Sequence, residues 1–408
     1  MYDILITSLP DMDKDKPAAG PAYLKGYLEQ HGFKVKVVDG NLIGNIDKLM
    51  LNIDKYEFKW LGISVFSYMQ KEIALELGSY YENVIYGGPG VTQEWTEKNY
   101  IRGDGEKALL EFLNGNHFYP GINGRPPVQL DDLSHMPDYS DTINEHEYFQ
   151  VVLRGSTGCV RNCTFCDIAN TWDKFKFVDG KTLANNMHKL YEQTGVKIIS
   201  FSDSLVNGSM KQFRELCSEL ASRETKIEWN GQFIAKTKKS FSEADFDNLA
   251  ASGCTGLTIG IESGSESVRH HMRKKFSNED LYYFVDNILS RGISIKFLLI
   301  VGYPTETEED FEDTKKLLTK YAKFSDLVAV SLDIMRIEHD TPIETDFEDL
   351  FTGTGHDWEN ELSDLQTRFK RFIDIFEHAE NLGYQFPYHA HNKKQRFMRY
   401  VQGEKVVL

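Results

Sequence analysis

The sequence predicts an α/β protein in which two sets of parallel strands alternate with helices. Three observations carry this prediction: short apolar runs alternate with helix-forming segments, glycines close several of the helical segments, and small or polar residues follow the apolar runs. This alternation is typical of open parallel sheets and of β/α barrels. We therefore expect an N-terminal Rossmann-like open sheet, a partial (β/α)6 barrel and a short α-rich C-terminal segment.

Length and composition limit the class of protein. The chain has 408 residues and 41% hydrophobic residues, enough for two or three domains. No apolar run approaches the roughly 18 residues that suggest a membrane-spanning helix, and the N-terminus lacks the basic start of a signal peptide. A net charge of −16 argues against a large nucleic-acid interface, which needs a basic surface. We expect a cytoplasmic monomer without a membrane or nucleic-acid partner.

Residues 1–125 are predicted to form the first domain. Its expected strands cover residues 3–7, 34–38, 60–64, 83–86 and 100–101, and its expected helices lie within 17–32 and 102–113. In open parallel sheets, ligands bind beyond the carboxyl ends of the strands. Small or hydroxyl-bearing residues stand at those ends here, and we expect a ligand at Ser64, Gly87, Gly88 and Thr92.

Residues 126–150 have the composition of a linker, with paired prolines, turns and scattered acids nearby. The barrel is expected over residues 151–345 and the helical C-terminal segment over 346–408. The predicted barrel strands are 151–153, 197–202, 226–233, 256–261, 294–301 and 328–335. The predicted helices are 181–194, 210–222, 243–252, 278–290, 308–321 and, in the C-terminal segment, 363–382.

Three clustered cysteines are the main chemical signal. Cys159, Cys163 and Cys166 have the spacing C-x3-C-x2-C in the stretch RGSTGCVRNCTFCD. Three neighbouring thiolates suit an iron–sulfur cluster or a zinc ion. The chain's other two cysteines, Cys217 and Cys254, lie far along the sequence and read as buried small apolar residues. A site with three protein ligands keeps one position open for another molecule.

A structural zinc site is the alternative reading of the three cysteines. It would require a fourth cysteine or histidine nearby. The nearest candidates are His146, 13 residues before Cys159, and His188, 22 residues after Cys166.

The cysteine spacing and its surroundings resemble the radical S-adenosylmethionine (SAM) superfamily. This resemblance implies that Cys159, Cys163 and Cys166 hold a [4Fe–4S] cluster and that SAM chelates the fourth iron. It also places Phe165 near the adenine of SAM. The reduced cluster would cleave SAM into methionine and a 5′-deoxyadenosyl radical, and the protein would position SAM and substrate.

The same resemblance indicates further SAM contacts at the ends of the barrel strands: Asp203, Gln232, Lys236, Glu262 and the turn Gly302-Tyr303-Pro304. Each has a structural alternative. Asp203 is also suited to capping the next helix, Lys236 to a solvated loop, and the Gly302 turn to the start of an acidic helix. A glutamate that ends an apolar strand, as Glu262 does, rarely faces a core unpaired.

The first domain resembles the cobalamin-binding domain found in a large class of radical SAM proteins. The segments that carry the resemblance are PAYLKGYLEQHGFKVKVVD, LGISVFS, YGGPGVT and RGDGE. The motif D-x-H-x-x-G, which supplies a cobalt-binding histidine in some cobalamin proteins, is absent here. Many relatives bind the corrin without it, and some keep the domain without the cofactor.

These resemblances lead to one main hypothesis and two alternatives. We expect a radical SAM enzyme that uses cobalamin to methylate an unactivated carbon of a small molecule or peptide, with flavodoxin or ferredoxin as reductant. The alternatives are cobalamin-independent rearrangement, cyclisation or oxidation, and a non-catalytic iron–sulfur or electron-transfer protein. The sequence identifies no catalytic residue.

Overall fold

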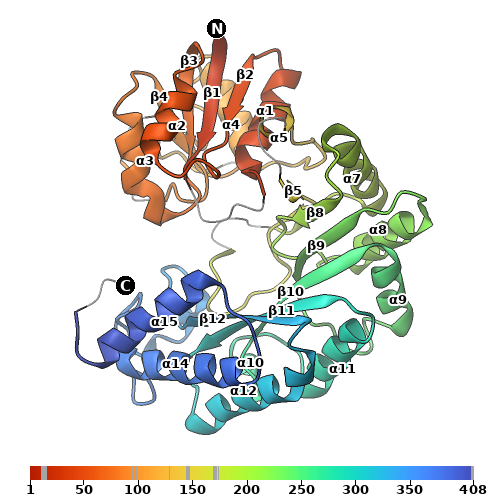
Figure 1. Cartoon of the computed structure of the whole chain (residues 1–408). Coiled ribbons are helices and arrows are strands. Elements are labelled where there is room, and N and C mark those ends of the chain that lie inside the picture. The colour runs from red at the N-terminus through yellow and green to blue at the C-terminus, as the bar shows by residue number, and fades with distance from the viewer. Residues whose placement is uncertain are drawn as a thin grey trace. The chain divides into compact units, whose positions relative to one another are not determined.

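Figure 1 shows the computed structural model of the protein, which describes residues 1–10, 16–92, 95–96, 99–127, 129–143, 148–168, 172 and 174–405. The chain divides into two compact units. The first contains Met1–Gly155 and Lys181–Ser202, and the second contains Ser156–Gly180 and Asp203–Leu408. The domain boundaries at residues 125, 150 and 345 stay predictions.

The first unit is built around a four-stranded parallel sheet in the order β2-β1-β3-β4. Its strands are β1 (Tyr2–Ser8), β2 (Val35–Val38), β3 (Phe58–Ser64) and β4 (Val84–Gly87). Its helices are α1 (Ala19–Gln30), α2 (Ile46–Ile53), α3 (Lys71–Gly78) and α4 (Gly105–Leu113), with a 3-10 turn, η1, at Tyr68–Gln70.

Both faces of this sheet are covered, as predicted. Successive residues of β1 point to opposite faces: Leu5 packs with the core that α2 and α3 contribute to, and Ile4 packs with the core that α1 and α4 contribute to. Figure 1 shows the two pairs of helices on either side of the strands. The open parallel sheet predicted from the sequence is therefore confirmed.

Two details of the first unit differ from the prediction. Helices α2 and α3 were not predicted, because each is only eight residues long, which is shorter than the window from which a helical pattern is read. The predicted fifth strand at residues 100–101 is reduced to a single isolated bridge, which Tyr100 forms in parallel with Tyr86 of β4. Ile101 forms an isolated antiparallel bridge to Ile122.

The segment after the first sheet packs closely on α1. Its short helix α5 (Ser140–Ile143) follows a bend whose Asp138 N–H donates to the Ala22 carbonyl at 2.9 Å. The buried Lys25 ammonium donates to Ser140 Oγ at 2.8 Å. Gly26 brings α1 against the backbone of this segment, since a Cβ there would lie 2.3 Å from the Met136 carbonyl oxygen.

The first unit also contains the parallel pair β5 (Gln150–Leu153) and β8 (Ile198–Phe201), and most of α7 (Gly180–Thr194). Arg154 follows β5 directly. Its guanidinium donates to Glu106 Oε1 at 2.9 Å, and its backbone N–H donates to the Tyr23 hydroxyl at 2.6 Å. These bonds fasten the end of β5 to α1 and α4.

The second unit contains four parallel strands in which sequence neighbours pair: β9 (Glu228–Phe233), β10 (Cys254–Glu262), β11 (Ser294–Val301) and β12 (Val328–Ile334). The strands alternate with helices α8 (Met210–Ser222), α9 (Glu243–Ala251), α10 (Glu266–His271), α11 (Asn278–Leu289) and α12 (Glu308–Tyr321). Capping boxes start α9, α11 and α12. The small antiparallel pair β6 (Ser156–Thr157) and β7 (Lys176–Phe177) precedes them.

The C-terminal part of the second unit is helical, as predicted. It contains α13 (Pro342–Asp346), α14 (Leu365–Asn381), α15 (Tyr388–Val401) and the 3-10 turn η3 (Glu348–Leu350). The 3-10 turn η2 (Ala322–Phe324) lies earlier, between α12 and β12. Figure 1 shows α14 and α15 side by side, and the stacked rings of Phe369 and Phe397 lie 4.0 Å apart. Among the described residues, no helix has both the length and the apolar character of a membrane span.

The contact between α1 and Met136 predicts opposite effects for two alanine substitutions in one helix. Gly26→Ala should lower the free energy of unfolding by about 1–3 kcal/mol, because the new methyl group overlaps the Met136 carbonyl. Gly20→Ala is the matched control: its Cβ would meet only Ser64 Oγ, at 3.6 Å, so it should be neutral or stabilise by up to about 1 kcal/mol. Urea unfolding of both variants tests this, and equal stability would contradict the close approach.

Candidate functional site

The three clustered cysteines lie in the second unit, on the loop that follows β6. They carry free, partly exposed thiols. The Arg161 N–H donates to Cys159 Sγ at 3.4 Å, so the backbone already turns toward that sulfur. Gly158 has a φ of +73°, and a Cβ there would lie 2.5 Å from the Lys174 carbonyl oxygen. The backbone of the segment before β7 therefore lies in close contact with the start of the cysteine loop.

The middle of the loop is fixed at Thr164, which is fully buried. Its N–H donates to the Met272 carbonyl at 3.3 Å, and its carbonyl accepts the Ile343 N–H at 2.7 Å. Its hydroxyl shares a hydrogen bond of 2.9 Å with the Tyr303 hydroxyl. Three segments that are distant in sequence thus hold the residue between Cys163 and Cys166.

The surroundings of the thiols suit a site that binds metal. Burial raises the pKa of Cys166 to about 11 and also raises that of Cys163. The neighbouring sulfurs raise both pKa values further, so the three cysteines lie close enough to interact. Because thiolates are the ligands of iron, a positively charged cluster would supply the charge that keeps these thiols ionised.

A structural zinc site would need a fourth protein ligand beside the three cysteines. Within the part of the chain that the structure describes, no three His, Cys, Asp or Glu side chains are grouped to hold one metal ion. Of the two candidate fourth zinc ligands, His146 lies outside the described residues, and His188 contacts the Ala184 carbonyl through Nδ1 at 3.0 Å.

Asp203 and Gln232 lie in the second unit with the cysteine loop. Asp203 is buried and accepts a hydrogen bond from Ser156 Oγ at 2.7 Å, which links it to β6. Ser209 is the N-cap of α8, so the alternative that Asp203 caps this helix is wrong. Gln232 has an exposed side chain on β9, and its carbonyl accepts the Val206 N–H at 2.9 Å.

Lys236, which follows β9, lies close to the cysteine loop. Burial lowers its pKa to about 8, nearby Arg161 lowers it further, and Cys159 opposes them. The side chain is half-buried, which does not fit the alternative of a freely solvated loop lysine. Lys236 and Arg161 thus place two cationic side chains beside Cys159, where they could bind a carboxylate. The sequence reasoning missed Arg161, although it lies inside the cysteine motif.

Glu262 is buried, and the structure pairs it with Lys274. The Lys274 ammonium donates to Glu262 Oε1 at 2.6 Å and lies 5.4 Å from the ring centre of Phe165. Phe165 also packs against an apolar cluster that includes Met272 and Tyr303. Sequence reasoning missed Lys274, since nothing in RHHMRKKF distinguishes it from its neighbours.

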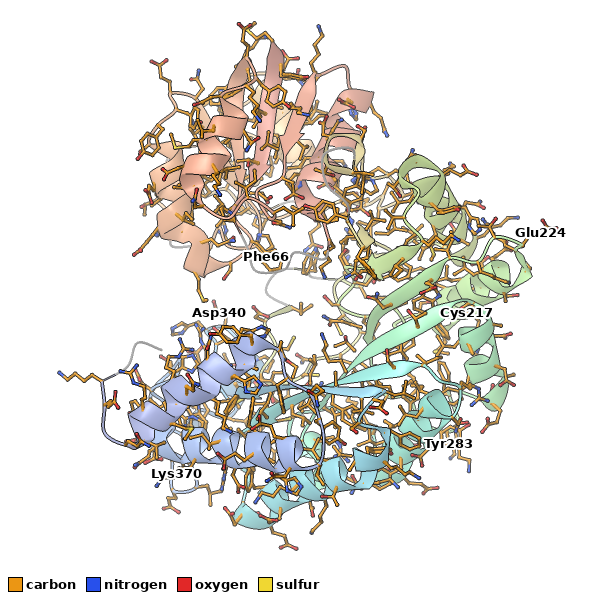
Figure 2. All side chains as sticks on the ribbon, viewed as in Figure 1. Phe66, Cys217, Glu224, Tyr283, Asp340 and Lys370 are labelled. Atoms are coloured by element: carbon orange, nitrogen blue, oxygen red, sulfur yellow. The ribbon has the colours of Figure 1, made fainter. Side chains whose placement is uncertain are left out.

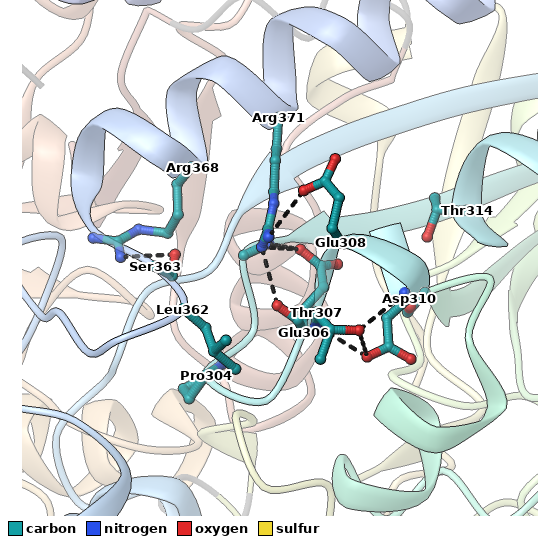
Figure 3. A network of polar contacts seen from close by, with 12 residues as sticks. Pro304, Glu306, Thr307, Glu308, Asp310, Thr314, Leu362, Ser363, Arg368 and Arg371 are labelled. Carbon is teal, nitrogen blue, oxygen red and sulfur yellow. Dashed lines mark hydrogen bonds and ion pairs between the residues drawn. The ribbon is translucent and has the colours of Figure 1, made fainter. Parts of the chain in front are cut away.

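The turn Gly302-Tyr303-Pro304 is tied to the C-terminal helices. The Gly302 N–H donates to Glu306 Oε2 at 2.7 Å, and Glu306 is fully buried. Figure 3 shows Arg371 of α14 reaching Glu306, with Nη1 3.0 Å from Oε2. The Pro304 carbonyl accepts from Asn360 at 2.8 Å. The turn predicted from the sequence is present, and its first amide already has an internal partner.

The predicted ligand-binding residues of the first unit gather at one edge of its sheet. Ser64 and Gly87 are direct neighbours at the carboxyl ends of β3 and β4. Gly88, with a φ of +109°, approaches the backbone of Val65 so closely that a Cβ would lie 2.6 Å from its carbonyl oxygen. Thr92 is exposed.

An exposed apolar side chain extends this edge. Phe66, labelled in Figure 2, is 70% exposed on the loop after β3, and Met69, in the 3-10 turn η1 that follows, is 73% exposed. The Phe66 N–H donates to the Gln70 side chain at 2.9 Å, which helps to order this loop. Sequence reasoning did not single out these two residues, because exposure cannot be read from the sequence.

Comparison with known proteins identifies the class. Residues 153–318 match the model of the radical SAM superfamily, so the chain carries a radical SAM domain and is classed as a radical SAM enzyme. This confirms the resemblance inferred from the cysteine motif. An uncharacterised methyltransferase of Pyrococcus horikoshii is 26% identical over 355 residues, which cover 76% of this chain and 75% of that protein.

Two solved structures match most of the length of this chain. The cobalamin-dependent SAM radical enzyme OxsB, with aqua-cobalamin bound, has a TM-score of 0.73 at 14% identity and covers 98% of this chain and 71% of its own. The radical SAM methyltransferase TsrM of Kitasatospora setae, with tryptophan and a SAM analogue bound, has a TM-score of 0.68 at 17% identity. That match covers 89% of this chain and 79% of TsrM. At these identities the likeness concerns the fold, and it confirms the predicted fold class.

The contact between Arg371 and Glu306 predicts a pH-dependent loss of stability in Arg371→Met. Removing one partner of a buried ion pair typically costs about 3–5 kcal/mol. Burial raises the pKa of Glu306 to about 7, against the attraction of Arg371. A raised carboxyl pKa means that the folded state holds this proton more tightly than the unfolded state, so the free energy of unfolding falls as pH rises from about 4.5 to 7.

Loss of Arg371 should raise the pKa of Glu306 further, and the cost should be larger at pH 8 than at pH 6. Urea unfolding at both pH values measures it. Lys370→Met removes an exposed positive charge from the same helix and should change stability by less than about 0.5 kcal/mol. Equal effects of the two substitutions would contradict the assignment of Arg371 as the buried partner.

Proposed function

We propose that the protein is a cobalamin-dependent radical SAM methyltransferase acting on an unactivated carbon of a small-molecule or peptide substrate. Cys159, Cys163 and Cys166 would hold a [4Fe–4S] cluster with one iron left for SAM. The observation that carries the proposal is the cysteine loop itself, whose central residue, Thr164, is held by three separate segments. Such pre-organisation suits a site that must present an open iron to a ligand.

Several side chains around the loop have the chemistry to bind SAM. Lys236 and Arg161, beside Cys159, would pair with its carboxylate. Asp203 and Glu262 are the nearby carboxylates suited to its amino group, and Gln232 offers an exposed amide. Phe165 and the Gly302-Tyr303-Pro304 turn would border the adenosyl part.

When bound, the reduced cluster supplies the electron that cleaves SAM and yields the 5′-deoxyadenosyl radical. The protein's own contribution is to orient SAM, to hold charge near it and to exclude water from the radical. Buried residues such as Thr164 and Tyr303 keep the loop from shifting relative to the SAM-binding groups. The electron must come from an external donor, for which a flavodoxin or ferredoxin is suited.

Cobalamin is proposed for the first unit on the basis of its sheet edge. The small residues Gly87 and Gly88 allow a large ligand to approach the backbone, and Ser64 and Thr92 offer hydroxyl groups. Phe66 and Met69 add exposed apolar surface, which a corrin ring would cover. The names of the matched structures, which include cobalamin-dependent enzymes, also support this assignment. No described residue is assigned as a cobalt ligand.

The first test concerns the cluster. Cys163→Ala should lose most of its iron and sulfide and should form no 5′-deoxyadenosine with SAM and dithionite under anaerobic conditions. Cys217→Ala removes a fully buried thiol on α8 and should keep wild-type iron content. Zinc in anaerobically purified wild-type protein, or full iron content in Cys163→Ala, would refute the cluster assignment. A wild-type cluster that never cleaves SAM would favour a non-catalytic iron–sulfur protein.

The second test concerns cobalamin. Wild-type protein reconstituted anaerobically with hydroxocobalamin should retain about one corrin per chain after gel filtration, seen in its visible spectrum. Phe66→Ser should weaken binding about tenfold or more, since covering a phenyl ring is worth about 1.5–3 kcal/mol. Tyr80→Ser is the control, because this exposed ring lies just before β4, at the amino end of that strand and not at the carboxyl ends where the corrin is proposed to bind. No corrin in the wild type would instead favour cobalamin-independent radical chemistry.

A further inference from the structure

Lys274 is a buried cation placed against the cysteine loop. Its side chain is 9% exposed, and its ammonium donates to Glu262 Oε1 at 2.6 Å and to the Gly260 carbonyl at 3.1 Å. It also lies over the ring of Phe165, 5.4 Å from the centroid. Because Phe165 directly precedes Cys166, the ammonium is held next to the predicted cluster and not in solvent.

The backbone on both sides of this ion pair is strained. Glu262 has a φ of +69°, and the residues flanking Lys274, Arg273 and Lys275, have φ values of +61° and +58°. Such left-handed conformations are uncommon for residues other than glycine and cost of order 1–3 kcal/mol each. The pairing register of β10 and β11 also shifts between Gly260 and Glu262.

Glycine at position 260 is part of the same arrangement. A Cβ there would lie 2.4 Å from Glu262 Oε1 and 2.9 Å from Lys274 Nζ. The chain therefore leaves room for the ion pair and accepts strained backbone to form it. A buried ion pair contributes little net stability by itself, so stability alone does not account for the strain.

The position of the Lys274 ammonium, over the ring of the residue that directly precedes Cys166, places a fixed positive charge beside the cysteine loop. In a site with little water, such a charge interacts more strongly than on the surface.

We propose that Lys274 raises the reduction potential of the cluster held by the three cysteines, and that Glu262 and the Gly260 carbonyl hold its ammonium in place. The inference rests on the proposed function, because it requires the [4Fe–4S] cluster at this loop. Reduction adds one electron and takes the cluster from the 2+ to the 1+ state. A nearby fixed positive charge stabilises the more negative, reduced state, and net charge is among the factors that set such potentials.

The test is an anaerobic redox titration of the reconstituted full-length protein without SAM. Dithionite supplies the electron, and the electron paramagnetic resonance signal of the reduced cluster is recorded against potential. Lys274→Met should shift the midpoint potential to a more negative value by about 59 mV. For a one-electron couple, this shift lowers the ratio of reduced to oxidised cluster about tenfold at a fixed potential. Lys274→Arg keeps the charge and should stay closer to wild type.

Lys275→Met is the matched control. It removes a neighbouring lysine that is exposed and has the same left-handed backbone, so solvent should screen its charge and the midpoint should not move. Equal midpoints for Lys274→Met, Lys275→Met and wild type would overturn the inference. Such a result would leave the proposed function intact, whereas a wild-type protein without any iron–sulfur signal would refute the function itself.

A double variant separates two roles of the lysine and avoids an unpaired buried carboxylate. Glu262→Gln combined with Lys274→Met removes both charges. If Lys274 acts on the cluster directly, the midpoint should remain below that of the wild type. A return to the wild-type midpoint would mean that Lys274 only neutralises Glu262, and this would overturn the inference.

Discussion

The structure of the site depends on how one short loop is held. A loop with three cysteines in eight residues has too few internal contacts to fix the direction of its sulfurs. Its buried centre, Thr164, is bonded to Tyr303, Met272 and Ile343, which come from the turn after β11, the end of α10 and the start of α13. The position of the sulfurs is therefore set by segments more than 100 residues further along the chain.

The same dependence extends to the C-terminal helices. Tyr303 belongs to a turn whose Gly302 amide is bonded to Glu306, and Glu306 is in turn paired with Arg371 of α14. The side chain of Arg368, one turn earlier on α14, occupies the space that a Cβ at Gly302 would fill. The buried guanidinium groups of Arg368 and Arg371 thus connect the C-terminal segment to the turn that carries Tyr303, and so help to fix the cysteine loop.

The sequence predicted the parts of the fold that have local signals. Apolar runs located all four strands of the first sheet, and capping residues and glycines located the longer helices. Asp203, Glu262 and the Gly302 turn were found because they end strands at a recognisable position. Lys274 was missed because its role depends on a left-handed backbone and a register shift in β10, neither of which has a signal in RHHMRKKF. Phe66 was missed because burial depends on the whole fold.

Charge explains why Lys274 and Arg161, which sequence reasoning missed, matter for the proposed site. The chain as a whole is strongly acidic, at −16, yet three cations, Lys236, Arg161 and Lys274, surround the cysteine loop. The proposed site would accept the carboxylate of SAM and then an additional electron, and both would add negative charge to a confined volume. Surface acids are screened by water and salt over about 8–10 Å, whereas the buried Lys274 and the half-buried Lys236 and Arg161 are screened less. The positive charges near the cysteine loop therefore offset the negative charge of the rest of the chain at the proposed cluster site.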